Sequence, residues 1–221
     1  MDSWIDFLSV TATSSTILLF LCGIPICRRI AQRGNTDGTS VAPFLLTSIS
    51  CACWLGYGII KDDNTIIFVN GVGFVFQTVY LCYYYYRTRI RRTLNKLVLF
   101  EVACCLVTWW FIRSDHSLDD KENVLGVICM FLNISTIGAP LLDVGQVIKT
   151  KSTESLPFSL CVMNMGVSVQ WLAYGILTDD FYMKMPNSVA VVISAIQLSL
   201  FAIYPATKYT TLVNKGPNDI L

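Results

Sequence analysis

The chain has 221 residues and a net charge of +1, and 54% of its residues are hydrophobic whereas only 14% are charged. A soluble domain carries roughly 25% charged residues, so this composition excludes a water-soluble protein and indicates an integral membrane protein. The small net charge gives no indication of a nucleic-acid partner, and we expect none. The nine cysteines lie in apolar runs without metal-ligand spacing, so we expect buried hydrophobic side chains and no metal or other cofactor.

Seven apolar runs follow one another along the chain, each long enough, or nearly so, to cross the hydrocarbon core as a helix of about 20 residues. We place them near Phe7–Cys27, Ala42–Ile60, Thr65–Tyr86, Leu94–Ile112, Val124–Leu142, Pro157–Leu177 and Met185–Ala206. We expect no cleaved signal peptide, because Asp2 and Asp6 stand where a basic segment would be needed. The sequence therefore predicts an all-α, multi-pass membrane protein.

The basic residues are divided unequally between the two membrane faces. Twelve of the 16 lie after the first, third and fifth runs or in the C-terminal tail, and the other face holds four: Lys61, Arg113, Lys121 and Lys184. The positive-inside rule therefore predicts an N-terminus that is outside or lumenal and a C-terminus in the cytosol. The sequence leaves open whether the membrane is the plasma membrane, the Golgi membrane or both.

A ten-residue motif occurs twice, 117 residues apart. It reads Trp-Leu-Gly-Tyr-Gly-Ile-Ile-Lys-Asp-Asp at Trp54–Asp63 and Trp-Leu-Ala-Tyr-Gly-Ile-Leu-Thr-Asp-Asp at Trp171–Asp180. Aligning Trp54–Val75 with Trp171–Val192 gives ten identities without a gap, where ordinary composition would give about one or two. Such self-similarity indicates an internal repeat of three helices.

The repeat predicts seven transmembrane helices arranged as two parallel three-helix bundles joined by one linker helix (3+1+3). A three-helix unit begins on one face and ends on the other, so one extra crossing turns the second unit upright. We assign residues 1–92 to the first repeat, 93–122 to the linker helix and external loop, 123–207 to the second repeat and 208–221 to a short cytosolic tail. Such repeats commonly enclose a substrate site near the bilayer midplane.

Further motifs accompany the repeat: Val-Asn-Gly-Val-Gly at 69–73, Ala-Pro-Leu from Ala139, Lys-Thr-Lys-Ser-Thr-Glu-Ser-Leu-Pro-Phe from Lys149, and Pro-Asn at 186–187. With them the chain resembles the SWEET (MtN3/saliva) family of eukaryotic sugar transporters over nearly its whole length. The resemblance implies a membrane transporter and not an enzyme, with a mono- or disaccharide as its substrate and the lipid bilayer as its surroundings.

Two tryptophans and two asparagines of the repeats fall at similar depths. Asn70 and Asn187 each lie seven residues beyond the last aspartate of the motif, about 10 Å below the outer end of the helix. Trp54 and Trp171 lie eight residues before its first aspartate. Sugar rings stack on aromatic faces, and sugar hydroxyls exchange hydrogen bonds with amides. We therefore expect a sugar site of these four residues, with interhelical packing as the alternative.

The resemblance adds detail to this site. Trp54 stands where many family members have a smaller residue, which implies a narrower cavity. Four further residues are implied to line the cavity more weakly: Leu21, Ser50, Ser135 and Val167.

Four prolines resemble the family's hinge prolines, whose bending accompanies gating on the cytosolic side. Pro25 and Pro140 lie inside predicted helices, where a proline frees a backbone carbonyl and permits a bend. Pro43 and Pro157 open predicted helices, where proline is also ordinary. The resemblance implies that all four are hinges.

An outer gate is implied for Tyr57, Tyr174 and Asp180, with Lys61 nearby. Each tyrosine lies three residues past its tryptophan, about one helical turn nearer the outside. An interfacial belt of aromatic residues is the alternative interpretation.

Ionisable residues are not expected near the midplane, because we place Glu101 and Asp143 towards the cytosolic ends of their helices. Proton-coupled carriers use such residues, and the chain has no Gly-x-x-x-x-Gly-Lys phosphate loop of an ATP-driven pump. We therefore predict passive, bidirectional transport (uniport) by alternating access.

Two other function classes remain as alternatives. A related carrier of amino acids or another small polar solute would share the fold, although such carriers have Pro-Gln at their hinges. A seven-helix receptor would share the helix count but leaves the repeat unexplained. The sequence does not indicate which sugar is carried or whether protomers form a homo-oligomer.

Overall fold

The computed structural model describes residues 2–136, 138–154 and 156–204. In these ranges the chain is helical, and seven helical spans are long and apolar enough to cross a membrane, as predicted. Two spans are divided in two: α1 (Asp2–Phe20) with α2 (Gly23–Arg33), and α6 (Leu118–Thr136) with α7 (Gly138–Thr150). The others are single helices: α3 (Ala42–Lys61), α4 (Asn64–Arg87), α5 (Arg92–Arg113), α8 (Phe158–Leu177) and α9 (Phe181–Ile203).

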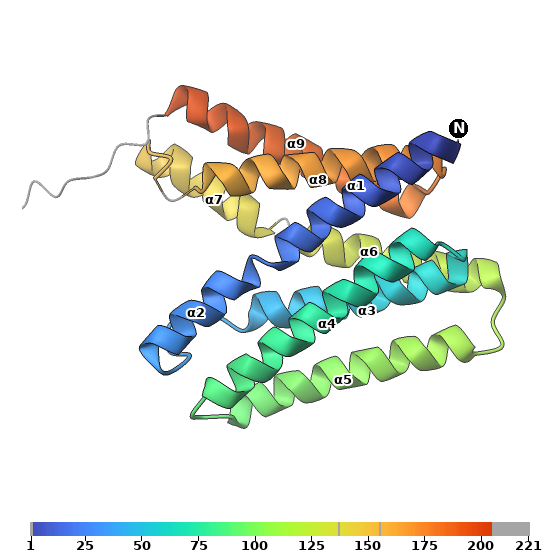
Figure 1. Ribbon diagram of the computed structural model, residues 1–221, viewed down its shortest axis with the longest axis horizontal. Coiled ribbons are helices and arrows are strands. Elements are labelled where there is room, and N and C mark those ends of the chain that lie inside the picture. Colours follow the sequence, from blue (N-terminus) through green and yellow to red (C-terminus); the bar gives the residue numbers. More distant parts are fainter. Residues whose placement is uncertain (1, 137, 155, 205–221) are drawn as a thin grey trace, which may run out of the picture.

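The helices form two bundles joined by α5 (Figure 1). α1–α4 form the first bundle and α6–α9 the second, with α3 packed on α4 and α8 packed on α9. The bundles meet where α1 lies against α8 and α3 lies against α6. α5 packs on α3, on the side of the first bundle that faces away from the second. The predicted 3+1+3 arrangement is therefore confirmed.

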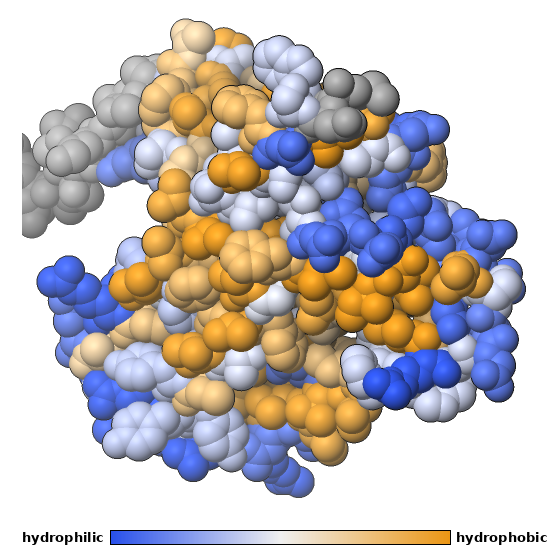
Figure 2. All heavy atoms as spheres, turned by 45° about the vertical axis from the view of Figure 1, so that its right-hand side comes forward, coloured by the Kyte–Doolittle hydropathy of each residue, from blue (hydrophilic) through white to orange (hydrophobic). Residues whose placement is uncertain are grey.

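Large apolar side chains cover much of the outer surface, whereas hydrophilic residues gather towards its ends (Figure 2). On α5, for example, Leu99, Leu106 and Trp110 remain 70%, 62% and 65% exposed. Apolar surface on this scale is unfavourable in water and suits a helix surrounded by lipid. The exposed belt therefore agrees with membrane insertion.

The repeated motif encodes the tight turn between the paired helices. Asp62 and Asp179 adopt left-handed backbone conformations with φ of 53° and 52°, which aspartate tolerates better than most residues. The next residue in each copy, Asp63 or Asp180, caps the following helix, because its side chain accepts hydrogen bonds from backbone N–H groups of the first turn. One aspartate thus turns the chain and the other starts the next helix.

The glycine that follows the motif tyrosine lets the two helices of each pair approach closely. A Cβ atom on Gly58 would lie 3.0 Å from the backbone nitrogen of Ile67, and one on Gly175 would lie 3.2 Å from that of Lys184. Because these neighbours are backbone atoms, they cannot rotate away. In the Tyr-Gly pair of the motif, the tyrosine is therefore followed by a glycine that the close approach of the two helices requires.

The span predicted as Phe7–Cys27 is not a continuous helix, because it breaks between α1 and α2. In the span predicted as Val124–Leu142, α6 and α7 are described on either side of residue 137, and Pro25 and Pro140 are the third residues of α2 and α7. A side chain from the last helix of each repeat donates to a backbone carbonyl in this region: Tyr80 Oη to Phe20 O at 3.1 Å, and Gln197 Nε2 to Pro140 O at 3.5 Å. Tyr80 and Gln197 are also 117 residues apart.

The other two hinge candidates stand at helix starts. Pro43 lies in the first turn of α3, and Pro157 is the N-cap residue of α8. Proline is common at such positions, because the backbone N–H groups there have no partner within the helix. A hinge role for these two residues stays a prediction.

Candidate functional site

Two tyrosines connect the repeats at the outer end of the molecule. Tyr57 Oη donates to Asp180 Oδ2 at 2.9 Å, and Tyr174 Oη donates to Asp63 Oδ2 at 2.9 Å. Each aspartate uses Oδ1 to cap its own helix and Oδ2 to accept from the opposite repeat. Hydrogen bonds to an ionised carboxylate are stronger than those between neutral groups. The four side chains therefore form a symmetric connection between the bundles.

The sequence prediction did not include Asp63 and named no partner for Lys61. Asp63 was detectable, because it lies 117 residues before Asp180 and is its equivalent in the repeat. Lys61 forms an ion pair with Glu122 on α6, with Nζ 2.8 Å from Oε1, and contacts neither tyrosine through a hydrogen bond. This ion pair is a further connection between the bundles at the same end.

The equivalent face of the second repeat carries a local ion pair instead. Lys184 Nζ lies 2.7 Å from Asp179 Oδ1, and both residues belong to the second repeat. The hydrogen bond from the Lys184 ammonium lowers the pKa of the exposed Asp179 carboxyl. The ion pairs at this end therefore differ between the two repeats, whereas the tyrosine–aspartate hydrogen bonds are equivalent.

The two tryptophans form a second symmetric layer beneath the tyrosines. Trp54 Nε1 donates to Asn133 Oδ1 on α6 at 3.4 Å, and Trp171 Nε1 donates to Thr16 Oγ1 on α1 at 2.8 Å. Thr16 and Asn133 are again 117 residues apart, so each indole reaches the same position of the opposite repeat. The sequence prediction missed both partners, although the repeat spacing relates them.

These side chains belong to one apolar cluster that spans the two bundles. Each tryptophan ring makes an edge-to-face contact with the tyrosine of its own motif, with centroids 5.4 Å apart in the first repeat and 5.6 Å in the second. The buried members of the cluster are Ile49, Cys53, Trp54, Tyr57, Ile66, Leu125, Cys129, Tyr174 and Met183. We call these nine residues the outer plug. They fill the space between the repeats at the outer end.

The two asparagines lie one helical turn further along α4 and α9 than Ile66 and Met183 of the outer plug. Asn70 Nδ2 donates to Ile66 O at 2.9 Å, and Asn187 Nδ2 donates to Met183 O at 2.8 Å. Both side chains are half-buried. Among the described residues, neither Oδ1 atom accepts a hydrogen bond from a protein group. Because each amide is tied only to its own helix, these bonds do not join helices, and each Oδ1 remains an acceptor for a ligand.

The four more weakly implied residues are scattered by comparison. Ser50 is buried on α3, Ser135 is exposed on α6, Val167 is half-buried on α8, and Leu21 lies at the break between α1 and α2. The described hydrogen bonds do not join any of them to the tryptophans or asparagines, and Ser135 Oγ donates to its own helix. Their part in a sugar site stays a prediction.

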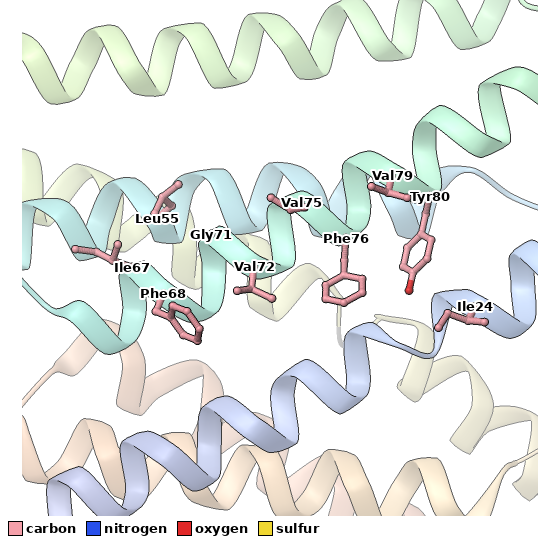
Figure 3. Close-up of a pocket in the computed structure, with 10 residues that line it drawn as sticks. All are labelled: Ile24, Leu55, Ile67, Phe68, Gly71, Val72, Val75, Phe76, Val79 and Tyr80. Carbon is pink, nitrogen blue, oxygen red and sulfur yellow. The ribbon is translucent and has the colours of Figure 1, made fainter.

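Two cavities lie outside this symmetric site. One has a volume of about 610 Å³ and lies between α4 and α2. Phe68, Val72 and Phe76 project from α4 towards the side of the cavity on which Ile24 of α2 lies (Figure 3). The other, of about 480 Å³, lies between α4 and α5. None of the predicted sugar-contacting residues lines either cavity. Their largely apolar walls suit lipid and do not suit a sugar.

Glu101 does not lie near the helix end where the sequence prediction placed it. It is the tenth residue of the 22-residue α5, and its side chain is only 6% exposed. It therefore lies roughly 13 Å along the helix from the basic end. However, α5 packs on the side of the first bundle that faces away from the second. Glu101 thus lies on a helix that packs on α3, and not on one of the helices at which the two bundles meet.

The hydrogen bonds described for α2 and α7 at the opposite, basic end stay within their own repeats, such as those from Arg87 to Ala31 O and from Gln197 to Pro140 O. α2 packs on α4 and α7 packs on α9, each inside its own repeat, and the two helices diverge in Figure 1. The bundles are therefore joined at the outer end and separate at the basic end.

Comparisons with known proteins agree with this architecture. Residues 6–92 and 123–209 each match the model of a family described as sugar efflux transporters for intercellular exchange. The chain is 34% identical over 207 residues to Sugar transporter SWEET1 of Drosophila pseudoobscura pseudoobscura, covering 93% of this chain and 92% of that protein. It is 30% identical over 215 residues to Bidirectional sugar transporter SWEET15 of Oryza sativa subsp. indica, covering 94% of this chain and 66% of the relative.

A solved structure gives the same result for the fold. The 3.7 Å structure of a eukaryotic SWEET transporter superimposes with a TM-score of 0.85 at 28% sequence identity. The match covers 93% of this chain and 99% of the other.

Proposed function

Because the chain belongs to the SWEET (MtN3/saliva) family of sugar transporters, we propose that it moves a mono- or disaccharide passively, in either direction, by alternating access. Its family makes it a transporter and not an enzyme. The similar rice protein is named a bidirectional sugar transporter, which supports the proposed direction of flux. We also propose the plasma membrane or the Golgi membrane as its location.

The observation that carries this proposal is the layer formed by the tryptophans and asparagines. Asn70 and Asn187 each keep an amide oxygen that no described protein group uses, at equal depth in the two repeats. Trp54 belongs to the outer plug and Trp171 packs against it, at a depth similar to that of the asparagines. A sugar hydroxyl donating to each oxygen, with a ring face against an indole, would use these groups. The indole of Trp54 is only 7% exposed, so Trp171 supplies most of the stacking surface.

The connections at the two ends support a cycle between two states. The outer plug and the paired tyrosines close one end, whereas the hydrogen bonds described for α2 and α7 at the basic end stay within their own repeats. We assign this arrangement to the state that opens towards the cytosol, because the positive-inside rule places the basic end there. Opening outwards would break Tyr57–Asp180 and Tyr174–Asp63. The breaks before α2 and α7 would then let those helices approach each other.

The chemistry of the proposed site supports uniport. Its polar groups are neutral amides, indole N–H groups and hydroxyls, which offer no acid to exchange a proton with the substrate. Glu101 is buried, but it lies on α5, which is not one of the helices at which the two bundles meet. The proposed site therefore has no evident means of coupling sugar movement to a proton gradient.

A liposome experiment tests this function directly. Purified protein should equilibrate radiolabelled glucose or sucrose in both directions without a pH or sodium gradient. Unlabelled sugar on the far side should accelerate exchange, whereas amino acids should not compete. Accumulation above the external concentration, driven by a proton gradient, would refute uniport. Flux of amino acids with no flux of sugars would favour the alternative carrier class.

A further inference from the structure

A groove of about 480 Å³ separates α4 from α5 on the first bundle. Its walls are formed by Phe74, Thr78, Leu81, Cys82, Tyr85, Val98, Glu101, Val102, Cys105 and Leu106. Along α4 the lining runs from Phe74 to Tyr85, which is about 17 Å of helix. That length is a little over half of the roughly 30 Å hydrocarbon core. The groove therefore has the depth of one leaflet.

The wall of this groove suits a hydrocarbon chain. Val102 and Leu106 are 47% and 62% exposed on α5, so the groove opens to the membrane. Of the strongly polar lining residues, Thr78 donates its hydroxyl to Phe74 O and Glu101 is only 6% exposed. Both present little polarity to an occupant. An acyl chain thus meets an almost wholly apolar surface.

A basic loop lies at one end of the groove, because it connects the two helices that form the walls. It contains four arginines within six residues: Arg87, Arg89, Arg91 and Arg92. The guanidinium of Arg91 lies 4.7 Å from the ring centroid of Tyr85, a lining residue, which places this charge at the groove's mouth. Ile90 is 86% exposed, as expected for a loop that dips into the membrane interface.

These arginines have no acidic partner among the described residues. Within the part of the chain that the structure describes, the ion pairs involve Lys61 and Lys184, and none involves an arginine. Arg87 donates to Ala31 O, whereas Arg89 and Arg92 are exposed at either side of the loop. Guanidinium groups bind phosphate through paired hydrogen bonds. An unpaired cationic loop thus adjoins an apolar groove of leaflet depth.

We propose that this groove and loop bind one anionic phospholipid from the leaflet at the arginine end, with an acyl chain between α4 and α5 and the phosphate on Arg89 and Arg92. The inference rests on membrane insertion and not on the proposed sugar transport. A second copy of the chain suits the surface less well. Copies in one membrane share an orientation, so their basic ends would meet and repel each other.

Native mass spectrometry of the purified protein in detergent tests the proposal. With equal amounts of dioleoylphosphatidylserine and dioleoylphosphatidylcholine, the wild-type protein should retain one phosphatidylserine in preference. Arg89→Gln with Arg92→Gln should weaken that preference roughly thirtyfold, because each arginine near the lipid surface contributes about 1 kcal/mol. Cys82→Phe, which narrows the groove, should reduce retention of both lipids.

The control is Arg28→Gln with Arg29→Gln, which removes two exposed arginines from α2 at the same end. This variant should keep the wild-type preference. If the control variant loses the preference for phosphatidylserine to the same extent, or if the wild-type protein shows no such preference, the proposal is overturned. Lipid binding would then reflect a general attraction to the basic end of the protein. Displacement of the lipid by soluble glycerophosphoserine would reduce the site to a phosphate site. If the protein instead forms a lipid-free dimer that Cys82→Phe disrupts, the groove binds a second copy of the chain and the proposal is overturned.

Discussion

Tyr57 of the first repeat and Asp180 of the second share a 2.9 Å hydrogen bond, and Tyr174 and Asp63 form the same bond with the repeats exchanged. Each aspartate also caps a helix, so the carboxylate is already fixed in position when the tyrosine reaches it. A short motif thereby turns the chain, starts a helix and joins the two bundles. The predictions below separate these roles.

The first prediction concerns the outer connection. Tyr57→Phe or Tyr174→Phe removes one hydrogen bond to a charged group, worth about 1.5–3 kcal/mol. Each change should shift the equilibrium towards the outward-open state by roughly tenfold or more. Distances between spin labels on Asn64 and Phe181, at the outer ends of α4 and α9, should report the opening.

Tyr182→Phe is the matched control, because Tyr182 Oη donates to Asn123 within the second repeat. It removes the same hydroxyl without touching the connection between bundles. Unchanged label distances in both test variants, or equal opening in the control, would contradict a gating role.

The second prediction concerns the sugar site. Asn70→Ala, Asn187→Ala and Trp171→Ala should each lower sugar flux per folded molecule by about tenfold or more, because one lost hydrogen bond costs about 0.5–1.5 kcal/mol and stranded partners add to that. Uptake normalised to folded protein in the membrane is the measurement. Asn95→Ala, an exposed position on α5, should leave flux unchanged. Normal flux per folded molecule in all three test variants would remove these residues from the site.

The third prediction concerns the helix breaks. Pro25→Ala and Pro140→Ala restore a backbone donor at the start of α2 and α7, which favours a straighter, continuous helix. Both variants should insert and fold normally but transport more slowly. Pro43→Ala provides the comparison, because α3 follows a non-helical segment, so a donor at Pro43 cannot join it to a preceding helix. If the Pro25 and Pro140 variants exchange sugar at the wild-type rate, the breaks are not hinges.

The fourth prediction concerns the glycine of the motif. Gly58→Ala places a methyl group 3.0 Å from the Ile67 backbone nitrogen, and such overpacking typically costs about 1–3 kcal/mol. Gly71→Ala, on the same helix pair, meets nothing within 4 Å and should be neutral or stabilising through helix propensity. Thermal unfolding in detergent should rank Gly58→Ala below wild type and Gly71→Ala at or above it.

The sequence by itself determined the membrane fold. Seven apolar runs of about 20 residues have few other solutions in a bilayer, because each backbone group must be satisfied within its own helix. The ten identities between Trp54–Val75 and Trp171–Val192 determined the repeat and therefore the extra crossing by α5. Equal spacing along equivalent helices also gave Asn70 and Asn187 the same depth. These properties depend on distance along one helix, which a sequence contains.

Only the tertiary structure decided which residues meet across the repeats. That Trp54 reaches Asn133, and that Trp171 reaches Thr16, depends on α3 lying against α6 and α1 against α8. Helical periodicity gives the depth of a side chain but not the helix that lies opposite it. For the same reason the sequence did not indicate that Lys61 pairs with Glu122 on α6. The pairing of helices between bundles is a packing property of the whole fold, so no local pattern specifies it.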